Sequence, residues 1–110
     1  MNSVALTRGF RPGVVERVRR DPEFAKALLN EAATLFLNGE ADTARLVLRD
    51  LVNATVGFEA LAAETSKPAK SLHRMLSKHG NPTMDNLAAI LAVLRKKLGV
   101  EMYAQAVEAA

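Results

Sequence analysis

Apolar residues recur along most of this chain at the three- and four-residue spacing of one face of an α-helix. In the first half, the pattern predicts a short helix over residues 13–20 and a longer helix that starts after Asp21 and stops at Gly39. Asp21 followed by Pro22 is typical of a helix start, because the carboxylate can cap free backbone N–H groups and proline suits the first helical position. The expected inward residues are Val14, Val15, Val18, Phe24, Leu28, Ala32, Leu35 and Phe36.

The same spacing predicts a helix over residues 42–55 and a shorter one that Gly57 caps and that runs toward a turn at residues 66–68. On the first, Ala44, Val47, Leu48, Leu51 and Val52 are expected inside, and Arg45, Arg49, Asp50 and Asn53 outside. On the second, Phe58, Leu61 and Ala62 are expected inside.

After this turn, a further short helix is expected to bury Ala69, Leu72, Met75 and Leu76. Residues 79–82, His-Gly-Asn-Pro, then break the chain. Thr83 is placed to cap a last long helix that stops at Gly99. Its expected buried stripe is Leu87, Ile90, Leu91, Leu94 and Leu98.

The two ends of the chain are less regular. Residues 1–12 have weak periodicity and are expected to form a loose arm, whereas residues 100–110 suit either a strand-like tail or a short helix. The sequence therefore predicts an all-α protein in three parts. The first part is an N-terminal arm with a helical extension (1–40). The second is a main domain (41–99), on which the extension packs, and the third is a C-terminal tail (100–110).

Composition excludes several classes of protein. The 110 residues include no cysteine, so a disulfide framework and a thiolate zinc site are excluded. No apolar run approaches the length of a membrane-spanning helix, and the N-terminus lacks the apolar stretch of a secretory signal. We therefore expect a cytoplasmic protein that does not enter a membrane.

Charge is distributed unevenly. The net charge is +3, but the segment from Thr65 to Met84 contains no Asp or Glu. It holds Lys67, Lys70, Arg74 and Lys78, whose spacings of three, four and four predict one shared helical face. A solvated helix face usually mixes both signs, and like charges four residues apart destabilise a helix slightly. The segment is therefore better explained as a surface that binds anions, and DNA phosphates above all.

Residues 42–99 resemble the phage-repressor family of helix-turn-helix domains, and most closely its addiction-module antitoxin branch. The part that carries the resemblance is residues 61–91, LAAETSKPAKSLHRMLSKHGNPTMDNLAAIL. Leu61-Ala62, Ser71-Leu72 and Gly80-Asn81-Pro82-Thr83 carry the resemblance. The chain departs from the family at Phe58, where Gln is common, at Ser66, where Gly is common, and at Pro68, where Ser or Thr is common. The resemblance implies a lambda-repressor-like helical bundle that binds double-stranded DNA as a homodimer, represses its own operon and has a possible toxin protein as partner.

The residues expected to face DNA are Lys67, Ala69, Lys70, Ser71, His73, Arg74, Ser77 and Lys78. Two interpretations of Ser71 stay open: a hydrogen bond to phosphate or base, or a small residue that lets two helices approach. The alternative function is a protein-binding helical module that neutralises a toxin and binds DNA weakly or not at all. Phe58 in place of Gln favours that alternative, whereas the acid-free segment favours DNA.

The sequence offers little evidence for any other kind of functional site. A second basic cluster lies near the N-terminus. It could form an arm that enters the DNA minor groove or, more simply, a solvated surface beside acidic neighbours. Its members are Arg8, Arg11, Arg17, Arg19 and Arg20. His73 and His79 are six residues apart, unlike the histidine pair of a helical zinc site. No phosphate loop or nucleophile–base set is present, so we expect no enzyme, no metal site and no cofactor.

Overall fold

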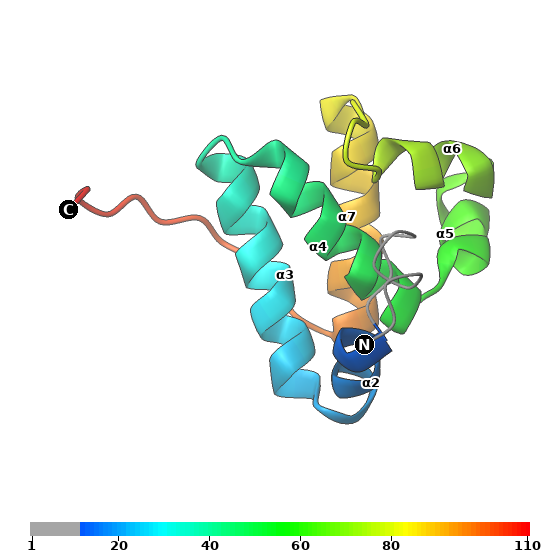
Figure 1. The fold of residues 1–110 in the computed structure, drawn as a ribbon, viewed down its shortest axis with the longest axis horizontal. Coiled ribbons are helices and arrows are strands. Elements are labelled where there is room, and N and C mark those ends of the chain that lie inside the picture. The colour runs from blue at the N-terminus through cyan, green and yellow to red at the C-terminus, as the bar shows by residue number, and fades with distance from the viewer. Residues whose placement is uncertain (1–11) are drawn as a thin grey trace.

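In the computed structural model, residues 12–110 are described, and they form six helices with no strand among them (Figure 1). The helices are α2 (Pro12–Arg20), α3 (Pro22–Leu37), α4 (Ala41–Ala54), α5 (Phe58–Thr65), α6 (Ala69–Met75) and α7 (Met84–Leu98). The all-α prediction is confirmed. Residues 1–11 of the expected loose arm, with Arg8 and Arg11, lie outside the described residues, and Pro12, its last residue, begins α2 instead.

Local capping fixes the predicted helix ends. The Asp21 side chain accepts hydrogen bonds from the backbone N–H groups of Glu23 and Phe24, at 3.2 and 3.3 Å, and so caps α3. The Thr83 hydroxyl accepts one from Asn86 N–H at 3.1 Å and caps α7. Gly99 ends α7 in the left-handed conformation, with φ of 67°, which glycine adopts without steric cost. These three predicted caps are confirmed.

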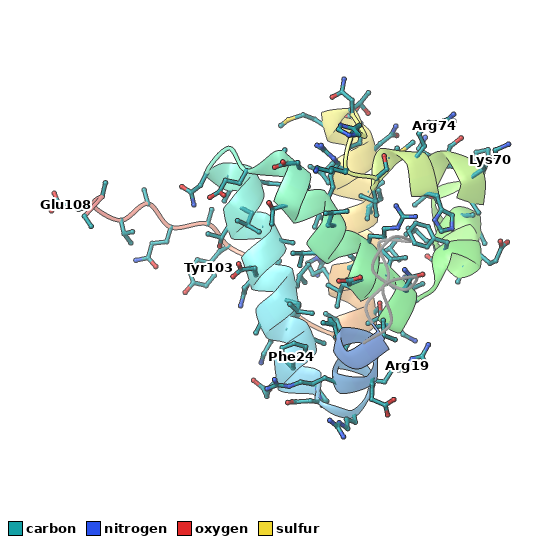
Figure 2. All side chains as sticks on the ribbon, in the orientation of Figure 1. Arg19, Phe24, Lys70, Arg74, Tyr103 and Glu108 are labelled. Atoms are coloured by element: carbon teal, nitrogen blue, oxygen red, sulfur yellow. The ribbon has the colours of Figure 1, made fainter. Side chains whose placement is uncertain are left out.

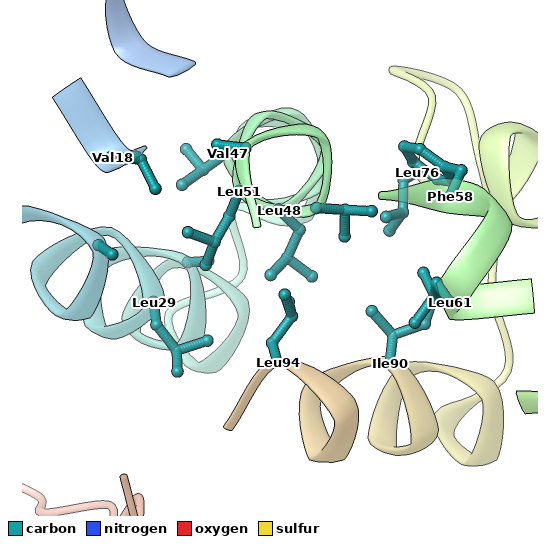
Figure 3. Packing of buried hydrophobic residues seen from close by; sticks show 14 of the residues in the cluster. Val18, Leu29, Val47, Leu48, Leu51, Phe58, Leu61, Leu76, Ile90 and Leu94 are labelled. Atoms are coloured by element: carbon teal, nitrogen blue, oxygen red, sulfur yellow. The ribbon is translucent and has the colours of Figure 1, made fainter. Parts of the chain in front are cut away.

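Helix α4 lies at the centre of the bundle. It packs along α3 and against α2, while α7 contacts α3 on one side and α5 on the other (Figure 1). Leucines from α3, α4, α5 and α7 meet in one continuous core, which Figure 3 shows around Leu48 and Leu51. The N-terminal helices therefore share their core with the helices that follow them.

Three expectations differ from the structure. Asp50, expected at the surface, is buried with 1 % of its area exposed, because α2, α3 and α5 all pack on α4 and leave it little outer face. Of the expected buried stripe of α7, only Ile90 and Leu94 are fully buried, whereas Leu87, Leu91 and Leu98 are half-buried and pack against the edge of the core. Residues 100–110 form neither the strand nor the short helix considered from sequence; they leave the body as an extended trace (Figure 1).

None of the helices in residues 12–110 combines the length and the apolar content that a bilayer crossing needs.

Candidate nucleic-acid interface

Helices α5 and α6 are joined by the three residues 66–68 and pack against each other. Ser66 ends α5 in the left-handed conformation, with φ of 57° and ψ of 37°, and Lys67 N–H then donates to the Ala62 carbonyl at 3.2 Å. Leu61 on α5 and Leu72 on α6 are both fully buried. These two leucines hold the helix pair on the core and fix which side of α6 faces outward.

The outward side of α6 carries positive charge. Lys70 and Arg74, one helical turn apart, are exposed and project away from the body in Figure 2, whereas Leu72 and Leu76 are fully buried. The ion pairs among the described residues are Arg17–Asp21 and Lys26–Glu23, so no described carboxylate neutralises the α6 cations. Lys70 and Arg74 therefore form a cationic surface that makes no ion pair with a carboxylate of residues 12–110.

The four cations do not share one helical face, which corrects the sequence prediction. Helix α6 has seven residues and ends at Met75, so Lys67 lies in the turn before it and Lys78 in the turn after it. The chain turns here because Gly80 packs directly on the last carbonyls of α6: a Cβ at this position would lie 2.5 Å from the Arg74 oxygen and closer still to that of Met75. Lys70 and Arg74 thus lie on α6 itself, with Lys67 in the turn before the helix and Lys78 in the turn after it.

Arg45 on α4 holds the chain that leaves α6. Its Nε donates to the Ser77 carbonyl at 2.9 Å and its Nη2 to the Lys78 carbonyl at 2.6 Å. A cation at these carbonyls also complements the negative end of α6. Helical periodicity predicts only a surface position for Arg45 and not this role, because the arginine and the two carbonyls are more than 30 residues apart and only the packing of α4 brings them together.

The ring of His73 stacks on the ring of Phe58. The two rings are stacked, with centroids 3.8 Å apart and planes 18° from parallel, and Phe58 is itself buried with 6 % of its area exposed. Phe58 is therefore a core residue that positions His73 rather than a free surface aromatic. Helical periodicity cannot predict this pair, because the two residues lie on different helices.

The surroundings of His73 disfavour its protonated form. Partial burial lowers the pKa of this imidazole below its usual value of 6.5, and the positive charge of Arg49 lowers the pKa further, while Glu59 acts weakly in the opposite direction. At neutral pH His73 is therefore an uncharged group that can donate or accept one hydrogen bond at the outer surface of α6.

The remaining predicted contact residues differ in accessibility. Lys78 is exposed, while Lys67 and Ser71 are half-buried. Ala69 packs against the core, so its side chain has little free surface. Ser77 is half-buried, and its hydroxyl donates to the Arg74 carbonyl at 2.8 Å. The structure therefore favours Lys70, His73, Arg74 and Lys78 as the groups best exposed to a ligand.

Two of the described N-terminal arginines, Arg17 and Arg19, lie away from α6. Arg17 pairs with Asp21 at 3.9 Å and lies 4.2 Å from the Phe24 ring centre, as expected for a solvated, internally balanced surface. Arg19 lies at the other end of the molecule from Lys70 and Arg74 (Figure 2). Among residues 12–110, no three His, Asp or Glu side chains gather in a way that would hold a metal ion.

Comparisons of the chain with protein-family models, with curated proteins and with solved structures found no match.

Proposed function

We propose that the protein is a sequence-specific regulator that binds double-stranded DNA, is of the antitoxin type and represses its own operon. The observation that carries the proposal is the outer side of α6, where exposed Lys70 and Arg74 lie in an acid-free segment and are backed by buried leucines. Helix pairs with a tight turn can place their second helix in the major groove, where such cations reach base edges and phosphates. The resemblance of residues 61–91 to phage-repressor-like domains supports the same function.

In this mechanism the residues have different tasks. Arg74 and Lys70 are placed to meet guanine acceptors or phosphates, and Lys78 to meet a phosphate beside the groove. Neutral His73 offers a hydrogen bond without adding charge. Arg45 does not contact DNA but holds the turn that carries Lys78, so it is a positioning residue.

The alternative is a toxin-binding helical module with weak or no DNA binding. Phe58 in place of the family's DNA-contacting Gln still favours it, because Phe58 is buried beside His73 and offers no hydrogen bond to DNA. The alternative therefore serves as the competing outcome of the test.

The test is fluorescence anisotropy on the DNA upstream of the protein's own coding sequence, compared with mixed genomic DNA. Arg74→Ala should weaken binding to the upstream site by about 1–3 kcal/mol, or roughly 5- to 150-fold, if Arg74 reads a base. Arg19→Ala is the matched control, because Arg19 is also an exposed helical arginine but lies far from α6. Equal affinity of the two variants for the upstream site would refute the proposal.

A salt series distinguishes phosphate contacts from base contacts. About four phosphate contacts in a dimer give a log–log slope near −3.6, at roughly 0.9 per contact. Lys78→Gln changes two contacts per dimer and should reduce the slope by about 2, with equal loss on all sequences. Wild-type binding that does not respond to salt would show that the cationic surface is only solvated, as the alternative function requires.

A further inference from the structure

Helix α4 carries two arginines, one helical turn apart, on the side that faces α6. The first, Arg45, donates hydrogen bonds to the carbonyls of Ser77 and Lys78 at the end of α6. Arg49 follows Arg45 by four residues on α4, and His73 precedes Ser77 by four residues on α6, and such a step keeps a residue on the same face of its helix. This register places the Arg49 guanidinium beside the His73 imidazole.

No carboxylate of residues 12–110 pairs with either group. The guanidinium of half-buried Arg49 makes no ion pair or hydrogen bond within this part of the chain. Partial burial lowers the pKa of His73 most, and the positive charge of Arg49 lowers it further, whereas the carboxylate of Glu59 on α5 opposes this with a smaller effect. Arg49 and His73 are therefore two adjacent donors that repel each other when both are charged, unless an anion lies between them.

Phe58 of α5 fixes the direction in which the imidazole points. The two rings are stacked with their centroids 3.8 Å apart, and Phe58 is buried. Stacking covers one face of the imidazole, but the ring nitrogens lie at its edge, and His73 remains exposed. Since the imidazole makes no hydrogen bond to residues 12–110, its nitrogens can reach an acceptor outside the chain.

We propose that Arg49 and His73 form a phosphate clamp in which His73 takes up a proton as a DNA phosphate binds, so that the protein binds DNA more tightly as the pH falls. The phosphate oxygens accept hydrogen bonds from the guanidinium and from the imidazolium. The proton comes from solvent and binds the ring nitrogen that carries none in the neutral imidazole. The inference rests on the proposed function only in that the phosphate belongs to DNA.

The charges around the clamp favour a phosphate at this position. Lys70 and Arg74, on the same helix as His73, are exposed and make no ion pair within the described residues, so they attract the neighbouring phosphates of a DNA backbone. A bound phosphate reverses the electrostatic effect of Arg49, because a negative charge beside the imidazole favours its protonated form. His73 therefore has a higher pKa in the complex than in the free protein.

This difference fixes the direction of the pH dependence. The added affinity is complete below the pKa of His73 in the free protein, and it is lost as the pH rises through the higher pKa in the complex. Each unit by which binding raises the pKa corresponds to roughly a tenfold change in affinity. A DNA phosphodiester keeps its charge over this range, so the response comes from the protein.

Fluorescence anisotropy with a mixed-sequence duplex, at constant ionic strength, tests the linkage. Wild type should bind at least about fivefold more tightly at pH 6 than at pH 8. His73→Gln should bind with less than about a twofold difference between these pH values, because it cannot take up the proton. His79→Gln removes the second of the two histidines and is the matched control, which should keep the wild-type response.

NMR titration of the histidines tests the clamp without DNA. The probe is dimethyl phosphate, a monoanion with the diester chemistry of the DNA backbone. It should raise the pKa of His73 more than sodium chloride does at equal ionic strength. Arg49→Met, which keeps the apolar stem of the side chain, should raise the pKa of His73 in the free protein and reduce the response to the probe. Arg19→Met, far from α6, should change neither.

A pKa of His73 that neither the duplex nor dimethyl phosphate raises would overturn the inference, and so would a pH response that survives in His73→Gln. A larger effect of sodium acetate than of dimethyl phosphate would overturn it as well, because the pair would then suit the carboxylates of a protein partner.

These outcomes are separate from the failure of the proposed function. Proton-linked DNA binding without preference for the upstream site refutes only the sequence-specific regulator. Sequence-specific binding without the pH response of His73 refutes only the clamp. If the protein binds no DNA, the proposed function fails, and the titration with dimethyl phosphate decides the clamp by itself.

Discussion

Removal of the Arg45 guanidinium should measure how strongly α4 holds the end of α6. Arg45→Ala deletes two hydrogen bonds from a charged donor, at 2.9 and 2.6 Å. Buried bonds of this kind contribute about 1.5–3 kcal/mol each. The first is half-buried and the second exposed, so solvent screening reduces the expected total to about 1–2 kcal/mol. For a domain near 100 residues this corresponds to a fall in Tm of roughly 4–16 °C.

The assay is urea unfolding followed by circular dichroism, with thermal melts at one fixed protein concentration. Arg45→Met keeps the apolar stem of the side chain and should show the loss that comes from the hydrogen bonds alone. Arg19→Ala is the control for removal of an exposed arginine and should change stability by less than about 0.5 kcal/mol. If Arg45→Ala unfolds at the wild-type midpoint, the two bonds do not hold the turn, and the positioning role of Arg45 is refuted.

Four further substitutions test individual parts of the structure. Ser66→Gly should stabilise the protein by about 0.5–1 kcal/mol, because it relieves the left-handed conformation at the end of α5; a Ser66→Ala variant as stable as Ser66→Gly would contradict this. Gly80→Ala should lower the free energy of unfolding in urea by about 1–3 kcal/mol, because the added Cβ would overlap the carbonyls of α6. Gly13→Ala is the control and should be neutral or stabilising, because a Cβ at Gly13 meets nothing within 4 Å. Equal effects of the two variants would show that α6 can shift freely. Leu72→Ala should cost about 2–5 kcal/mol and half-buried Leu91→Ala clearly less, and the reverse order would show that the core is wrongly placed. The lowered pKa of His73 means that the unfolded chain binds its proton more readily, so acidification below pH 6.5 should destabilise wild type more than His73→Gln; parallel Tm curves for the two proteins between pH 7.5 and 5.5 would exclude this.

The positions of the helices and of several helix ends could be predicted from the amino-acid sequence. Apolar spacing predicted six helical segments, and the caps at Asp21, Thr83 and Gly99 fixed boundaries, because a cap depends on a side chain and backbone groups only a few residues away. The burial of Leu72 and Leu76, with Lys70 and Arg74 outside, followed from the same periodicity.

Features that depend on contacts between residues distant in the chain could not be predicted from local sequence. Periodicity predicted a helical face that extends to Lys78. Helix α6 ends earlier, because Gly80 packs against its last carbonyls and Arg45 of α4 donates hydrogen bonds to the chain that follows it. The same limit explains Phe58 beneath His73 and the burial of Asp50, since each depends on which helices pack together. For residues 100–110 the local sequence left a strand and a short helix both open, and the structure has neither, because an isolated segment of this length is too short to hold a helix without packing against the body.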